Sequence, residues 1–234
     1  MSQAKIKNPN AKSNSFVWIL VAIVAIIAVV LAVIFTKGEE KINADTAFNV
    51  TVDGSAITLA ADTAGPGTPE VDLYEDYMCP HCAELGEATD DEMQAALNEG
   101  KLIVHIRTLN FLVPGDDGMS TRVGTAALAV AKTGDTKAFW DFRKSMMEQQ
   151  SAAYTAKWDA DKLAEEAKKA GANGDAVKAI ADDTEKQTFL ANATENSNTL
   201  KQVPPDNQVS SPRVIFNGAD VSPVDQWVEI VTTS

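Results

Sequence analysis

The residues best suited to chemistry in this chain are its two cysteines, Cys79 and Cys82, which are separated only by Pro80 and His81. Two thiols at this spacing can form a disulfide and pass it on by thiol–disulfide exchange. Cys79 would attack or be attacked, and Cys82 would resolve the mixed disulfide. A protonated His81 would add a nearby positive charge and favour the Cys79 thiolate. Because a stabilised thiolate is a good leaving group and stabilises the reduced form, the pair is predicted to donate disulfides rather than to reduce them.

The predicted elements place this pair where a strand ends and a helix begins. Residues 71–77 are a strand candidate, and the pattern becomes helical over residues 80–98. The first turn of a helix leaves backbone N–H groups unpaired and presents a partial positive charge. A thiolate is stabilised there, so the pKa of Cys79 is predicted to fall. Pro80 suits this turn because it has no N–H group.

Two other roles of the cysteine pair stay open at this point. A structural disulfide at this spacing would close a very short loop and remove little chain entropy. A metal site would need more ligands, and besides the cysteines the chain offers His81, His105 and, as a soft ligand for copper, Met78. We therefore predict no metal site and no bound cofactor.

Strand and turn patterns predict a small sheet. Residues 48–52 and 55–60 alternate apolar and polar side chains around Asp53-Gly54, which is typical of a hairpin. Residues 102–109 are apolar and β-branched and predict a further strand. Residues 213–216 predict another strand, followed by a turn.

Helical patterns fill most of the chain between these strands, over about residues 116–203. Asp135 and Asp159 can each cap a helix, and residues 175–200 predict one or two more helices. After the hairpin the order is therefore strand–helix–strand, a helical insert, then one or two strands and a helix. This order argues for an α/β fold with a small sheet and a helical subdomain.

Residues 16–35 form an uncharged apolar run that is long enough to span a membrane. The alternative, a cleaved signal peptide, would have a shorter apolar core and a small-residue cleavage site. Three lysines in residues 1–15 favour a cytoplasmic tail. We therefore expect a single-pass anchor in the lipid of the cell membrane and a linker over residues 36–47. Residues 48–234 would then form a domain outside the cytoplasm, where disulfides persist.

Charge is divided unevenly along the chain. The formal net charge is −13, yet the first 41 residues carry five lysines and two glutamates. A domain as acidic as the remainder would repel phosphate, so nucleic acid is excluded as a partner. It would also repel acidic substrates. One apolar run and two cysteines exclude multi-span transporters and disulfide-stapled miniproteins. No segment indicates a dimerisation domain, so we expect a monomer.

Several segments together resemble a DsbA-type thiol:disulfide oxidoreductase. They are residues 74–82 with the Cys-Pro-His-Cys motif, the helix after it, the helical insert with Phe139-Trp140, and residues 211–218 with the sequence Ser-Pro-Arg-Val-Ile-Phe-Asn-Gly. The resemblance covers about residues 70–234. It implies a thioredoxin-like fold with an inserted helical domain, with Cys79 as nucleophile and Cys82 as resolving thiol. Pro80 and His81 between the cysteines are the pairing associated with oxidases in this family.

The resemblance also implies a substrate-binding loop. Pro212 occupies the position of the family's cis-proline, which faces the active-site disulfide and helps to hold an extended substrate chain. Ser211 would then lie beside the sulfurs, where its hydroxyl could donate to the thiolate and tune its pKa. An X–Pro bond tolerates the cis form because it has lost most of the usual preference for trans.

The chain departs from the family's pattern at two positions. Many relatives carry a buried acid, used in proton transfer, six residues before the first cysteine, where this chain has Leu73. Glu75 lies on the same strand face as Leu73, and it is either a substitute proton acceptor or a solvated acid. Arg213, where small or β-branched residues are common, either adds positive potential near Cys79 or points to solvent.

The resemblance implies an enzyme that introduces disulfide bonds into exported proteins with free thiols. It also implies reoxidation by a quinone-linked membrane partner, DsbB-like or VKOR-like (related to vitamin K epoxide reductase). Two alternatives are a reductase or isomerase that serves one maturation pathway, and a non-catalytic metal-binding module.

Overall fold

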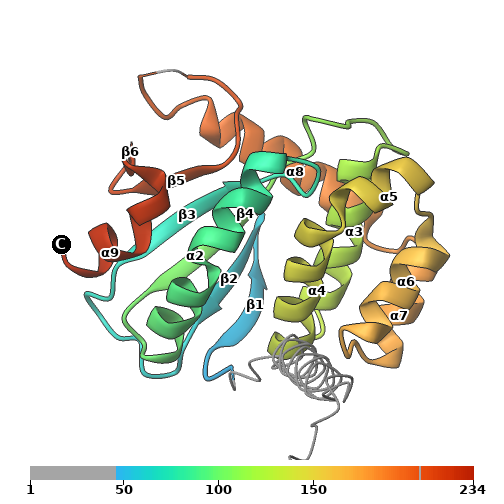
Figure 1. Cartoon of the computed structure of the whole chain (residues 1–234), viewed down its shortest axis with the longest axis horizontal. Coiled ribbons are helices and arrows are strands. Elements are labelled where there is room, and N and C mark those ends of the chain that lie inside the picture. The colour runs from blue at the N-terminus through green and yellow to red at the C-terminus, as the bar shows by residue number, and fades with distance from the viewer. Residues whose placement is uncertain (1–45, 206) are drawn as a thin grey trace, which may run out of the picture. The chain divides into compact units, whose positions relative to one another are not determined.

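The structure is a computed structural model and describes residues 46–205 and 207–234. These residues form a mixed sheet of six strands in the order β1-β2-β4-β3-β5-β6 (Figure 1). β3 and β4 are parallel, and the other neighbouring strands are antiparallel. The strands are β1 (Asn49–Asp53), β2 (Ala56–Ala60), β3 (Glu70–Glu75), β4 (Ile103–Thr108), β5 (Arg213–Phe216) and β6 (Ala219–Asp220).

The N-terminal part of the predicted organisation lies outside the described residues. This applies to the cytoplasmic tail (1–15), the transmembrane anchor (16–35) and all but the last two residues of the linker (36–47). In the part of the chain that is described, no helix is long and apolar enough to cross a membrane.

Helices connect and cover the strands, and the α/β class with a helical insertion is confirmed. α2 joins the parallel strands β3 and β4, and α3 to α8 are inserted between β4 and β5. Asp135 and Asp159 cap α4 and α6 as predicted. The helices are α2 (Pro80–Asn98), α3 (Met119–Ala131), α4 (Thr136–Glu148), α5 (Gln150–Ala156), α6 (Ala160–Lys169), α7 (Gly174–Ala181), α8 (Lys186–Leu200), the 3₁₀ helix η1 (Val224–Gln226) and α9 (Trp227–Thr232).

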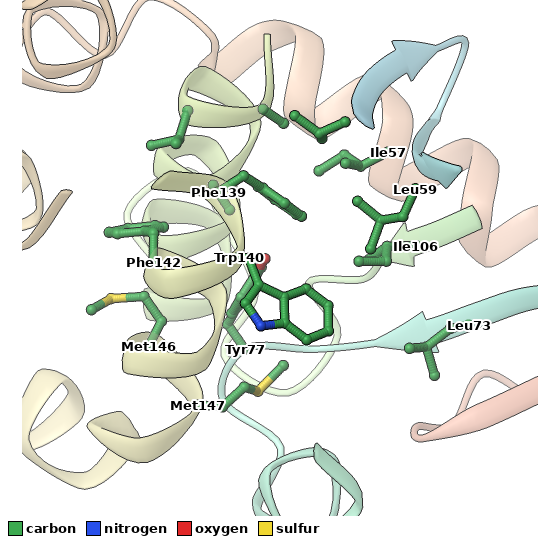
Figure 2. Close-up of a cluster of buried hydrophobic side chains, with 14 of the residues drawn as sticks. Ile57, Leu59, Leu73, Tyr77, Ile106, Phe139, Trp140, Phe142, Met146 and Met147 are labelled. Atoms are coloured by element: carbon green, nitrogen blue, oxygen red, sulfur yellow. The ribbon is translucent and has the colours of Figure 1, made fainter. Parts of the chain in front are cut away.

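Helix α4 packs the insertion against the sheet. Figure 2 shows Trp140 between the helix and the strands, whereas Phe142 and Met146 lie on the opposite side of the helix. Trp140 meets the ring of Phe48 edge-on, with ring centroids 5.6 Å apart. The Arg143 guanidinium lies 5.7 Å from the centre of the Trp140 ring. The insertion is thus held rigidly on the sheet, close to the ends of β3 and α2.

Two further contacts fix the helices that flank the redox motif. Gly124 lets α3 and α8 approach closely, because a Cβ atom there would lie 2.2 Å from Cζ of Phe189. On the other side, Trp227 at the start of α9 is fully buried and donates its indole N–H to the Thr89 hydroxyl of α2 at 3.2 Å. Helix α2 is therefore held in place by the C-terminal helix.

The strand before the cysteines ends two residues earlier than predicted. Asp76 is fully buried, and its carboxylate accepts the N–H groups of Met78 at 2.9 Å and Leu112 at 3.1 Å. Its backbone carbonyl accepts the N–H of Cys79 at 2.9 Å. These bonds replace strand pairing with a tight turn, and this turn delivers the chain into α2.

Candidate active site

The structure places Cys79 at the N-cap of α2, directly after the turn at Asp76. Pro80 follows as the first helical residue, as expected for a residue without an N–H group. The Cys79 carbonyl accepts the N–H groups of Cys82 at 3.0 Å and Ala83 at 3.2 Å. The helix therefore starts at the nucleophile itself, and its unpaired N–H groups lie close to the sulfur.

This environment lowers the pKa of Cys79 to about 6. The largest cause is a hydrogen bond from the Cys82 thiol, which favours the Cys79 thiolate over the opposing effect of burial. Ser211 and the backbone N–H groups of Cys82 and His81 lower the pKa further. The thiolate that the sequence predicts is thus stabilised mainly by the second cysteine, and additionally by the helix.

The two thiols differ in charge rather than in exposure. Cys79 is 4 % exposed and Cys82 is 3 % exposed. Both are in the free thiol form. Burial, and then the hydrogen bond to Cys79, raise the pKa of Cys82 far above its usual value. Near neutral pH the pair therefore carries its negative charge on Cys79.

His81 lies on the exposed side of the motif. Its Nδ1 is 2.8 Å from Oε2 of Glu84, one turn further along α2. This hydrogen bond is the first cause of a raised His81 pKa, followed by the charges of Glu84 and of Cys79. The raised pKa favours the protonated imidazolium, which is the form that supports the thiolate.

The loop before β5 comes to the cysteines from across the sheet. The Ser211–Pro212 peptide bond is cis, as the resemblance implies. The Cys79 thiol points at the Ser211 backbone carbonyl, with Sγ and O 3.4 Å apart. The Ser211 hydroxyl is buried and lacks a hydrogen-bond partner among the described residues, although its proximity lowers the pKa of both cysteines. The Ser211 carbonyl therefore contacts the Cys79 thiol, and the Ser211 side chain lowers the pKa of the thiol, as predicted.

Pro212 reaches the second cysteine rather than the first. Its ring and the Cys82 side chain line the same small cavity, which Glu75 and Arg143 also line. The cavity lies under the redox pair, between β3, α2 and α4. The structure thus brings together all six residues singled out from the sequence, which are Cys79, Pro80, His81, Cys82, Ser211 and Pro212.

One contact to the nucleophile was not found from the sequence. The Gln150 carboxamide, at the start of α5, donates to the Cys79 carbonyl at 2.9 Å and lies 3.5 Å from Sδ of Met147. Gln150 and Cys79 are 71 positions apart, and no motif marks the glutamine. The helical insertion therefore touches the redox motif directly.

Glu75 is not the solvated acid that was one of its two predicted states. It is 1 % exposed, and Arg143 donates to its carboxylate through Nε at 3.0 Å and Nη2 at 2.7 Å. The same guanidinium binds both carboxylate oxygens of Asp90 at 2.9 Å. Burial raises the pKa of Glu75, and Arg143 only partly offsets this. A buried acid, Glu75, therefore lies beneath the site, although Leu73 occupies the position where many relatives carry such an acid. The role of Glu75 in proton transfer stays a prediction.

Arg213 does not point to solvent, which was one of its two predicted states. Its side chain is 7 % exposed and binds the Asp220 carboxylate through Nε at 2.7 Å and Nη2 at 2.5 Å. Nη1 reaches the Gln208 carbonyl at 3.3 Å. Arg213 thus joins β5 to β6, and a contribution of its charge to the potential at Cys79 stays a prediction.

The described residues contain no group of three or more His, Cys, Asp or Glu side chains placed to hold a metal ion. His105, one of the candidate ligands, instead lies on β4 with Nδ1 2.9 Å from the Thr58 hydroxyl. Its Nε2 is 3.3 Å from Glu70.

Comparison with known proteins agrees with this geometry. A family model described as thioredoxin matches residues 66–232. A comparison with curated proteins finds no match. Among solved structures, the MdbA thiol-disulfide oxidoreductase from Corynebacterium diphtheriae is 39 % identical, with a TM-score of 0.76 over 82 % of this chain and 99 % of that one. MdbA from Corynebacterium matruchotii is also 39 % identical, with a TM-score of 0.77 over 81 % and 94 %.

More distant structures share the fold. DsbA from Mycobacterium tuberculosis in its reduced form is 19 % identical, with a TM-score of 0.58 over 76 % of this chain and all of that one. The family model, the identity to the two MdbA proteins and the cysteine pair at the start of α2 lead to one conclusion. This chain belongs to the thioredoxin family and is a DsbA-type protein thiol-disulfide oxidoreductase.

Proposed function

We propose that this enzyme works in the oxidising direction and donates the Cys79–Cys82 disulfide to dithiols of exported proteins. The observation that carries the proposal is the charge distribution of the reduced pair. The pKa of Cys79 is lowered to about 6 while that of Cys82 is raised. A thiolate stabilised in this way leaves readily from a mixed disulfide, and it stabilises the reduced enzyme relative to the oxidised one.

Exchange would proceed in two steps. A substrate thiolate attacks the Cys79 sulfur, the Cys79–Cys82 bond breaks, and Cys82 leaves with the electron pair and takes up a proton. The second substrate thiolate then attacks the substrate sulfur of the mixed disulfide and expels Cys79 as a stable thiolate. The substrate has lost two electrons and formed its disulfide, and both enzyme cysteines are reduced.

Substrate would meet the motif from the side of the cis-proline loop. Ser211 and Pro212 lie against Cys79 and Cys82 respectively, so an extended chain along this loop would pass the reacting sulfur. We assign these two residues to substrate binding, as the resemblance to the family implies. The reduced pair would be reoxidised by a quinone-linked membrane partner of the DsbB-like or VKOR-like kind.

We further propose that residues 16–35 anchor the enzyme in the cell membrane, with the catalytic domain outside the cytoplasm. Support comes from the length of the apolar run and from the lysines before it. Anchoring would raise the effective concentration of the enzyme near exported chains and near a membrane-bound oxidase.

The test uses the full-length protein, oxidised beforehand, and a peptide with two cysteines. The wild type is expected to convert the dithiol peptide into its disulfide. Cys79→Ser should lose this activity, because the Cys79–Cys82 disulfide that the substrate attacks can no longer form. Cys82→Ser, given the disulfide form of the peptide instead, should accumulate a mixed disulfide through Cys79 that is visible by mass spectrometry, because the enzyme thiol that would resolve it is absent. Oxidation of the peptide by Cys79→Ser would refute the mechanism. Net reduction of disulfide peptides instead of oxidation of dithiols would favour a reductase or isomerase.

A further inference from the structure

A cleft of about 630 Å³ lies between α2 and α4, which run side by side in Figure 1. One wall is the face of α2 between Ala83 and Asp91, and the other is the end of α4 between Lys144 and Glu148. Ala83 lies one turn of helix beyond Cys79, so the cleft begins beside the redox motif.

The cleft is connected to the nucleophile through the helical insertion. Met147 lines it and contacts the Gln150 carboxamide, which donates to the Cys79 carbonyl. Apolar surface from Ala83 and Met147 therefore forms the end of the cleft nearest the sulfur. A polypeptide bonded to Cys79 in a mixed disulfide could continue into the cleft without leaving the surface of the enzyme.

The lining of the cleft is strongly negative. Its one basic side chain is Lys144, whose Nζ lies 3.2 Å from Asp91. Two further acids, Glu87 and Glu148, are exposed on opposite walls. Within residues 46–205 and 207–234 neither of them forms an ion pair. Each wall of the cleft thus carries one exposed carboxylate that has no ion-pair partner among the described residues.

We propose that this cleft binds the segment of a substrate polypeptide next to its reacting cysteine, and that it selects segments rich in lysine and arginine. The methylene stems of these side chains can cover Ala83 and Met147 while their charged ends reach Glu87 and Glu148. A negatively charged cleft also raises the local concentration of cations and the rate of their encounter. The inference names a substrate class for the site and rests on the proposed function.

The experiment compares three dithiol peptides that differ only in whether lysine, glutamate or serine flanks the cysteines. Each is oxidised by the full-length enzyme, and second-order rate constants are measured at low and high salt. The lysine peptide is expected to react about ten-fold faster than the glutamate peptide at low salt. The difference should shrink at high salt, where exposed charges are screened.

Charge reversal in the cleft is compared with an equal reversal elsewhere, because the whole domain is acidic. The double variant Glu87→Lys/Glu148→Lys should abolish the preference for lysine. The control Glu195→Lys/Glu229→Lys reverses two exposed acids on α8 and α9 and changes the total charge by the same amount. This control should keep the preference for the lysine peptide. The rate with the serine peptide is measured for each variant and serves as the reference to which its rates with the lysine and glutamate peptides are compared.

Each outcome decides between distinct conclusions. Equal rates for the three peptides, or loss of preference in both double variants, would overturn the cleft as the selecting site. In that case oxidation of the serine peptide would still support the proposed function. Failure of the wild type to oxidise any of the three peptides would instead count against the proposed function, on which the inference rests.

Discussion

At the level of single residues, the reactivity of Cys79 depends on its neighbours. In the reduced full-length protein, the rate of Cys79 alkylation by iodoacetamide should rise with pH around pH 6 and level off above it, because its pKa is about 6. Cys82 should stay unreacted, since burial raises its pKa. Mass spectrometry of the alkylated protein measures both rates.

A control tests the cause of this shift. Cys82→Ala removes the thiol that donates to Cys79, so it should move the midpoint towards the ordinary value of about 8.5. Cys82→Ser keeps a donor and should move it less. A wild-type midpoint near about 8.5 would contradict the assignment of Cys79 as the stabilised thiolate.

The motif alone was enough to predict which residues meet at the site, but not how they interact. Cys79, Cys82 and His81 are close in sequence, so helix geometry predicts their arrangement. Ser211 and Gln150 lie 132 and 71 positions from Cys79. Only the folded chain shows that one contributes a backbone carbonyl and the other a carboxamide, because contacts between residues so far apart in sequence leave no local pattern.

At the level of elements, the insertion is joined to the sheet by a buried ion network. Arg143 of α4 holds Glu75 of β3 and Asp90 of α2, and all three side chains are at most 6 % exposed. Arg143→Met should destabilise the reduced protein by about 3–5 kcal/mol at neutral pH, because it leaves two buried carboxylates without a counterion. Denaturant unfolding of the full chain, followed through the tryptophans of the domain, gives this value.

The pH dependence of the loss has a definite sign. Burial raises the pKa of Glu75 and Arg143 opposes this rise, so without Arg143 the protonated form of Glu75 is tolerated and its ionised form is not. The loss of unfolding free energy caused by Arg143→Met should therefore be smaller at about pH 4 and should grow as the pH rises towards neutrality. Lys137→Met, which breaks an exposed pair with Asp141 on the same helix, should cost less than about 0.5 kcal/mol. Equal losses in the two variants would contradict this account of the network.

The elements were predicted better than the contacts between them. Helix α2 spans Pro80–Asn98 as its pattern predicts, since a proline start and apolar spacing are local features. β3 ends early because Asp76 binds Leu112, 36 positions away. The ion pairs of Arg143 with Glu75 and Asp90 could not be predicted from the sequence either, because ion pairs between distant elements give no periodic pattern.

At the level of the whole molecule, the thiolate links the redox state to stability. A folded-state pKa of Cys79 below its unfolded value gives the reduced protein stability that is present at higher pH and is lost as the pH falls through about 6. The oxidised protein has no thiolate and therefore lacks this pH-dependent stabilisation. The reduced form should thus be favoured at neutral pH, which makes the disulfide a strong oxidant.

The reduction potential of the Cys79–Cys82 pair tests this account most directly. It is measured by equilibrating the full-length protein with mixtures of reduced and oxidised glutathione at neutral pH. A value near or above about −150 mV is predicted for a disulfide donor with a stabilised Cys79 thiolate. A value near about −270 mV would make the enzyme a reductant and would contradict the proposed direction of exchange.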